Sequence, residues 1–166
     1  MSLEISEDLV SLAYQSLGYF VIEGRMVGRK EIDLLALRVG EEGRVAERLH
    51  IEVQISVTPV GLLRGKPGLP TGRDLHEATR DFVIKKFLDP RIEAEVSRAF
   101  GGKSYDRVLV HGRVSNPEQL KVLASRHNIR CEAVRDLVNR ATASDAPNRL
   151  KRAFGIAELI VNGRKQ

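Results

Sequence analysis

The chain has 166 residues and a net charge of +5, and its balance of 42% apolar and 30% charged residues excludes an intrinsically disordered protein. One cysteine, Cys131, excludes an internal disulfide and a zinc site built from several thiolates. No apolar run approaches the roughly 18 residues of a membrane span and no secretory leader pattern is visible, so we expect a cytoplasmic protein without a membrane partner.

The first third of the chain predicts a helix followed by strands. Apolar residues recur at helical spacing over residues 6–17, and Gly18 stands where a helix C-terminal glycine is expected. Residues 19–22 predict a short strand. Two further apolar runs, residues 32–39 and 46–57, flank a Gly-bounded turn and predict an antiparallel hairpin.

Residues 58–73 differ from the rest of the chain. They are rich in Gly and Pro, contain Arg64, Lys66 and Arg73, and contain no acid. This composition predicts a flexible basic loop. Loops of this length are uncommon in compact domains and are often functional.

The remainder of the chain alternates helices and strands. The expected elements are a helix from about Asp74 to a break at Pro90, a helix over 92–100, a strand over 106–111, a helix from the Asn116 N-cap to about His127, a strand over 129–134 and a helical C-terminal extension over 135–166. The order predicts one α/β domain over residues 1–166, with a mixed central sheet flanked by helices.

The predicted hairpin carries acids among its apolar residues. If its turn is centred at residues 42–43, Asp33 lies directly opposite Glu52, with Cβ atoms about 5 Å apart. Strand alternation places Glu52 and Gln54 on one face. Two carboxylates on neighbouring strands repel each other and are costly to bury. Mg²⁺ or Mn²⁺ would relieve that repulsion, with the Val53 backbone carbonyl available as a third oxygen ligand.

The same segments resemble a known family. Glu7, Gly18-Tyr19-Phe20-Val21, Ile32-Asp33-Leu34-Leu35-Ala36 and Ile51-Glu52-Val53-Gln54 together look like the motif of the PD-(D/E)XK nuclease superfamily, and within it the archaeal Holliday junction resolvases and related small endonucleases. The resemblance covers about residues 6–57 and implies a restriction-endonuclease-like αβββαβ core. Ile32 replaces the proline that gives the motif its name.

The resemblance implies a role for each of these residues. Asp33 and Glu52 would be metal ligands, and Glu7 would complete or orient the metal's ligand shell. Gln54 stands where the family usually has lysine; its amide can hydrogen-bond the attacking water but brings no charge. The expected catalytic residues are therefore Asp33, Glu52, Gln54 and Glu7.

Several nearby polar residues have simpler explanations. Glu7 can be an acid favoured by the helix dipole, and Glu4 and Asp8 compete with it for the metal role. Glu31 shares the face of Asp33 but is expected to be exposed at a strand start. The residues expected to be ordinary sheet-end or solvated side chains are His50, His76, Lys85 and Lys86.

The basic charge balance favours DNA as the partner, because Lys and Arg displace counterions from phosphates. The residues expected to contact phosphates are Arg29, Lys30, Arg64, Lys66 and Arg73. Aromatic residues make up 5% of the chain and Trp is absent, which argues against single-stranded RNA recognition by base stacking.

The function favoured by these observations is a metal-dependent endonuclease that hydrolyses DNA, with branched or structured DNA as candidate substrates. A homodimer is expected by analogy with enzymes that cut paired strands. The alternative is a nuclease-like fold that has lost catalysis and serves as a DNA-binding or assembly module. The missing lysine motivates this alternative.

Overall fold

The structure of the chain is a computed structural model, which describes residues 3–55, 72–112, 114 and 116–144. The elements in chain order are α1 (Leu3–Ser16), β1 (Tyr19–Val27), β2 (Lys30–Val39), β3 (Val45–Gln54), α2 (Gly72–Lys86), α3 (Pro90–Ala99), β4 (Asp106–His111), α4 (Pro117–Ser125), β5 (Ile129–Ala133) and α5 (Val134–Ala143). Among the described residues, no helix is both long enough and apolar enough to cross a membrane.

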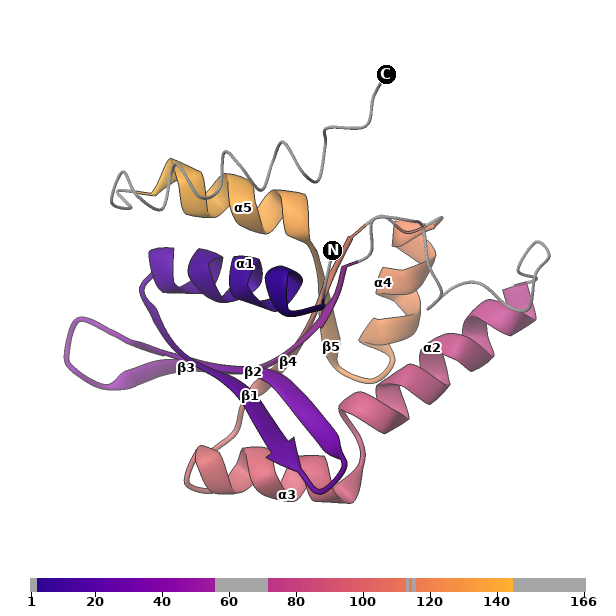
Figure 1. The fold of residues 1–166 in the computed structure, drawn as a ribbon, viewed down its shortest axis with the longest axis horizontal. Coiled ribbons are helices and arrows are strands. Elements are labelled where there is room, and N and C mark those ends of the chain that lie inside the picture. The colour runs from indigo at the N-terminus through magenta and orange to yellow at the C-terminus, as the bar shows by residue number, and fades with distance from the viewer. Residues whose placement is uncertain (1–2, 56–71, 113, 115, 145–166) are drawn as a thin grey trace.

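The five strands form one sheet in the order β1-β2-β3-β4-β5 (Figure 1). β1, β2 and β3 are antiparallel neighbours, whereas β3, β4 and β5 run parallel. Parallel neighbours need a crossover connection, and helices separate β3 from β4 and β4 from β5 in the chain. The expected α/β class and mixed central sheet are therefore confirmed.

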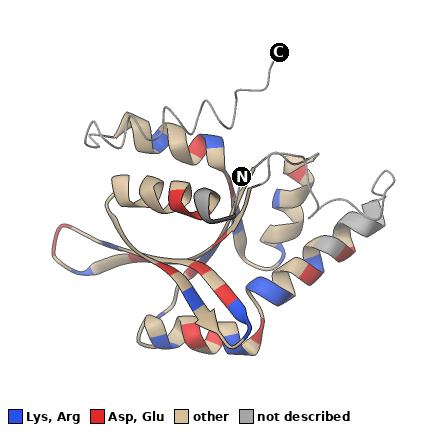
Figure 2. Ribbon diagram, in the orientation of Figure 1, with Lys and Arg blue, Asp and Glu red and all other residues tan. Residues whose placement is uncertain are grey.

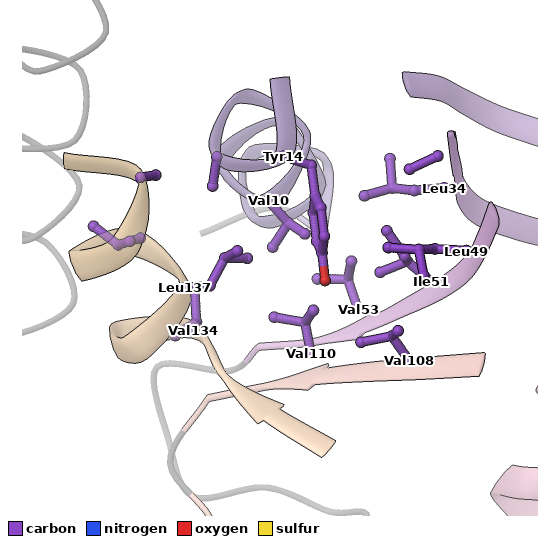
Figure 3. Close-up of a cluster of buried hydrophobic side chains, with 14 residues drawn as sticks. Val10, Tyr14, Leu34, Leu49, Ile51, Val53, Val108, Val110, Val134 and Leu137 are labelled. Atoms are coloured by element: carbon purple, nitrogen blue, oxygen red, sulfur yellow. The ribbon is translucent and has the colours of Figure 1, made fainter. Parts of the chain in front are cut away.

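Helices cover both faces of the sheet. α1 and α5 lie on one face, and α2, α3 and α4 lie on the other (Figure 1). The core under α1 and α5 is apolar, with Val10 and Tyr14 packed against Leu34, Ile51 and strand residues of β4 (Figure 3). Each fully buried aliphatic side chain contributes roughly 1.5–3 kcal/mol, so this core holds β2 and β3 in position beneath α1.

The boundaries of β1 and α2 differ from the prediction in ways that bear on the site. β1 continues to Val27, well past the expected end at residue 22, because the polar residues Glu23 and Arg25 are tolerated on an edge strand with an exposed face. α2 begins at Gly72, so Arg73 belongs to this helix and not to the preceding loop. The rest of the predicted basic loop and the C-terminal extension beyond residue 144 lie outside the described residues.

Candidate functional site

The site forms where β2 and β3 part. Their ladder pairs Leu34 with Ile51 and continues in the register predicted from the turn as far as Arg38 and Glu47. At the next residue, Asp33, a side chain replaces the backbone as the hydrogen-bond acceptor: Asp33 Oδ2 accepts the Val53 N–H at 2.8 Å. The buried Asp33 carboxylate thus supplies the hydrogen bond that the Val53 N–H would otherwise lack where β2 and β3 diverge.

The two predicted acids converge on one cation. Lys86 Nζ lies 2.9 Å from Asp33 Oδ1 and 2.6 Å from Glu52 Oε2. The Glu52 side chain is fully buried, and that of Asp33 is 7% exposed. The predicted convergence of Asp33 and Glu52 on one side of the sheet is therefore present in the structure, with an ammonium between the carboxylates.

Charge and burial oppose each other in this cluster. Burial, followed by the charge of Asp33, raises the pKa of Glu52 well above its ordinary value, while Lys86 acts to lower it. Burial acts to lower the pKa of Lys86, but Glu52 and Asp33 outweigh it and the net pKa is raised. Lys86 is therefore a charged ammonium at neutral pH, and it compensates carboxylates that would be costly to bury alone.

Lys86 was expected to be a solvated residue, and the structure corrects that expectation. It lies in the last turn of α2, beside the fully buried Phe87 and one helical turn beyond the fully buried Val83. The sequence feature that could have indicated this role is the position of Lys86 at the edge of the apolar stripe formed by Val83 and Phe87. Figure 2 shows this basic end of α2 against the sheet. Residue 54, where the family usually has its lysine, is the last residue of β3, whereas Lys86 is the last residue of α2, the next described element.

His50 is a second residue whose sequence interpretation was wrong. It was expected at the end of the sheet, but it is fully buried within β3, and its Nε2 lies 2.9 Å from Glu52 Oε1. Burial, together with the charges of Arg107 and Lys86, lowers the pKa of His50 to about 3. The imidazole is therefore neutral. When Glu52 is ionised it accepts this hydrogen bond and Nε2 carries the proton, so the ring fixes the orientation of the carboxylate.

Glu7 joins the cluster electrostatically. It is half-buried in α1, and burial followed by the charges of Asp33 and Glu31 raises its pKa to about 7. Its neighbour Asp8 is exposed, so the structure favours Glu7 over Asp8 as the acid nearest the site. The side chain of Glu4 lies outside the described residues. Glu31 is exposed, as expected.

Gln54 and the Val53 backbone lie at the end of β3. Gln54 is half-buried, and strand alternation places its side chain on the same face as Glu52. Its carbonyl accepts the Gly112 N–H at 3.0 Å. The N–H and C=O of one strand residue point the same way, so the Val53 carbonyl faces the gap between β2 and β3, as does the N–H bonded to Asp33.

Two of the five predicted phosphate contacts, Arg29 and Lys30, have side chains within the described part of the chain. Arg29 is exposed in the turn between β1 and β2. The Lys30 ammonium pairs with Asp89 at the N-cap of α3, which ties the start of β2 to that helix. Arg64, Lys66 and the side chain of Arg73 lie outside the described residues. Among the described residues, Arg29 and Lys30 are the two predicted phosphate contacts whose side chains can be placed, and Lys30 is already paired with Asp89.

The donor set limits the kind of metal that could bind. Within the described part of the chain, no three His, Cys, Asp or Glu side chains are grouped to hold a metal ion. A structural zinc site needs such a group. Mg²⁺ typically takes one or two carboxylates and completes its octahedron with waters and substrate phosphate. Asp33, Glu52 and the Val53 carbonyl fit this second pattern.

Comparisons with known proteins add no relative. No protein-family model, no curated protein and no solved structure matches the chain. Functional inference therefore depends on the cluster of Asp33, Glu52, Lys86, His50 and Glu7.

Proposed function

We propose that the chain is an endonuclease of the PD-(D/E)XK type that hydrolyses DNA phosphodiester bonds with Mg²⁺ or Mn²⁺. The observation that carries the proposal is the convergence of Asp33 and Glu52, from two diverging strands, on a single cation. A purely structural role does not require two buried carboxylates on adjacent strands, because an apolar pair of similar volume would be no less stable.

Asp33, Glu52 and the Val53 carbonyl would hold the metal, and Glu7 would support its waters. A bound divalent ion lowers the pKa of a water and neutralises charge on the phosphate in the transition state. His50 keeps Glu52 oriented through its 2.9 Å hydrogen bond. In the hydrolysis, a water oxygen bonds to phosphorus, the bond to the leaving sugar oxygen breaks, and that oxygen takes up a proton.

Lys86 provides the positive charge that Gln54 lacks. Its side chain is 26% exposed, and its ammonium stands on a flexible four-carbon stem. From its place beside Asp33 and Glu52, the Lys86 ammonium would offset the negative charge that develops on the phosphate during cleavage. Gln54, on the same face as Glu52, would hydrogen-bond the attacking water. The two roles that the family's lysine usually combines are thus divided between Lys86 of α2, which supplies the charge, and Gln54 of β3, which positions the water.

The Lys86 ion pairs also favour a second candidate function. Without a metal, the ammonium already compensates Asp33 and Glu52, so the fold does not depend on a divalent ion. A nuclease-like module that only binds DNA or assembles with a partner would need nothing more. The two candidates differ in whether the carboxylates bind Mn²⁺ and whether DNA is cut.

A cleavage screen tests the proposal. Single-stranded, duplex, flapped and four-way DNA would be incubated with and without Mg²⁺, using the wild type and Asp33→Asn. The asparagine retains an oxygen that can accept the Val53 N–H but removes the charge, so the fold should persist while cleavage falls about 100-fold or more, as for loss of a several-kcal/mol electrostatic contribution. Equal cleavage by Asp33→Asn would refute the assignment. Salt-sensitive DNA binding without cleavage of any substrate would favour the non-catalytic module.

A further inference from the structure

A groove lies between α2 and α4, two helical turns from Lys86. Its volume is about 180 Å³, well below the roughly 300–1,000 Å³ of pockets for drug-sized ligands. It therefore suits a small group such as a phosphate. α2 and α4 lie close to each other on the same face of the sheet (Figure 1), and each contributes to the walls.

The walls carry groups that bind oxyanions. Arg80 of α2 and Arg126 after α4 both line the groove, and both side chains are exposed. A guanidinium is always charged, and its planar fork matches phosphate oxygens. His76 and His127 add imidazole donors to the same lining. Glu77 also lines the groove, and Arg80 Nε lies 3.7 Å from Asp81 Oδ1. Both members of that ion pair are exposed, so it holds Arg80 only weakly and leaves the guanidinium able to contact a phosphate.

A buried hydroxyl is the second observation that points to a ligand. Thr79 lies in the groove lining, is 2% exposed, and its Oγ1 has no hydrogen-bond partner among the described residues. Leaving a buried hydroxyl unpaired is unfavourable. A phosphate oxygen seated in the groove can accept its hydrogen bond.

The position of the groove relates it to the carboxylate cluster. Thr79 and Lys86 are almost two full turns apart on α2, so they lie on the same side of the helix, about 10 Å apart along its axis. A nucleic-acid strand that passes Lys86 and runs along α2 would bring another of its phosphates to the groove.

We propose that the groove between α2 and α4 binds a backbone phosphate of the nucleic-acid substrate, held by Arg80 and Arg126. The proposal rests on the proposed function for the place of the reaction, but it concerns binding and can be tested without cleavage.

The test measures DNA affinity in EDTA as a function of salt. A fluorescein-labelled 30-base-pair duplex would be titrated with the wild type, with Arg80→Gln/Arg126→Gln, and with Arg44→Gln/Arg135→Gln. The control removes the same charge from the β2–β3 turn and from α5, where both side chains are largely exposed. The loss of one phosphate contact should make the slope of log K against log salt shallower by about 1. The control should change the slope by less than half as much.

Two further measurements make the result decisive. Arg126 lies at the C-terminal end of α4, where a cation also stabilises the helix dipole. Thermal unfolding must therefore show that the double variant in the groove is folded at the assay temperature. If it is not folded, the single variant Arg80→Gln replaces it. Inorganic phosphate titrated by NMR should shift the His76 and His127 resonances.

An unchanged salt slope, or a change equal to that of the control, overturns the proposal even if DNA is cut. Saturation by inorganic phosphate together with an unchanged DNA slope identifies a site for free phosphate and overturns it too. A shallower slope in a protein that never cleaves DNA upholds the groove and refutes the nuclease function, so the two failures are distinguishable.

Discussion

The two faces of β3 differ sharply in character. Toward α1, Ile51 and Val53 pack into a wholly apolar cluster (Figure 3). Toward α2, His50 and Glu52 are just as buried but polar: they contact each other and Glu52 pairs with Lys86, while His50 Nδ1 has no hydrogen-bond partner among the described residues. One strand therefore carries a face that stabilises the fold and a face whose buried charges need compensation. The second arrangement is typical of functional sites, because it costs stability.

The largest effect on stability is expected on the apolar face. Ile51→Ala removes a fully buried side chain and should destabilise the protein by about 2–5 kcal/mol. Ile22→Ala, at a side chain that is 51% exposed, is the matched control and should change stability by about 0.5 kcal/mol or less. Urea unfolding monitored by circular dichroism measures both. Equal effects would show that β3 is not the strand that anchors this core.

On the polar face, Lys86→Gln should destabilise the metal-free protein by about 1–3 kcal/mol, because it leaves two buried carboxylates without their cation. The expected loss is smaller than the roughly 3–5 kcal/mol of a fully buried ion pair, because the Lys86 side chain is partly exposed. Adding Mg²⁺ should restore most of the loss. Lys85→Gln, at the exposed neighbouring position, should change little. The readout is the urea midpoint with and without Mg²⁺, and a loss in Lys86→Gln that Mg²⁺ does not recover would contradict the shared site.

His50 should influence metal binding through Glu52. His50→Leu removes the hydrogen bond to Glu52 Oε1 and should weaken Mn²⁺ affinity about 10–100-fold, the usual cost of losing a partner of a metal ligand. His50→Gln keeps an N–H donor at a comparable reach and should recover much of that affinity. Calorimetric titration distinguishes the two variants. If both lose affinity equally, His50 acts only through packing.

The smallest effect is a pH dependence from Glu7. Its pKa is about 7 in the folded protein, against 4.5 for the ordinary side chain. Between these values the folded state holds more protons than the unfolded state, so stability falls as pH rises from about 4.5 to 7. Without metal, Glu7→Gln should flatten this part of the curve. Urea midpoints of both proteins at pH 4.5 and 7.5 give the difference, and parallel curves would place Glu7 outside the cluster.

Local patterns predicted much of the first half of the chain. The β2–β3 register follows from the position of a Gly-bounded turn and holds from Leu34 and Ile51 to Arg38 and Glu47. The ladder does not extend to the predicted pair of Asp33 and Glu52, whose carboxylates instead meet at Lys86. Helix α1 ends where Gly18 adopts a φ of +85°, a conformation that glycine adopts readily. These features depend on residues close in sequence, which is why pattern and spacing sufficed.

The rest of the site depends on contacts between distant segments. Lys86 reaches Asp33 across 53 positions of the chain, and strand or helix periodicity carries no information about such a contact. His50 was misjudged because a histidine within a strand does not reveal how deeply that strand is buried. The roles of both residues depend on the packing of α2 against β3, which brings Lys86 to Glu52 and Phe87 to His50.

Titration of Mn²⁺ by calorimetry tests most directly whether Asp33 and Glu52 share one divalent ion whose place Lys86 takes in its absence. The wild type should bind one ion per chain, Lys86→Gln should bind it more tightly because the competing ammonium is gone, and Asp33→Asn should bind it at least 10-fold more weakly. Lys85→Gln should match the wild type. Absence of binding in the wild type, or affinity unchanged by Asp33→Asn, would contradict the account.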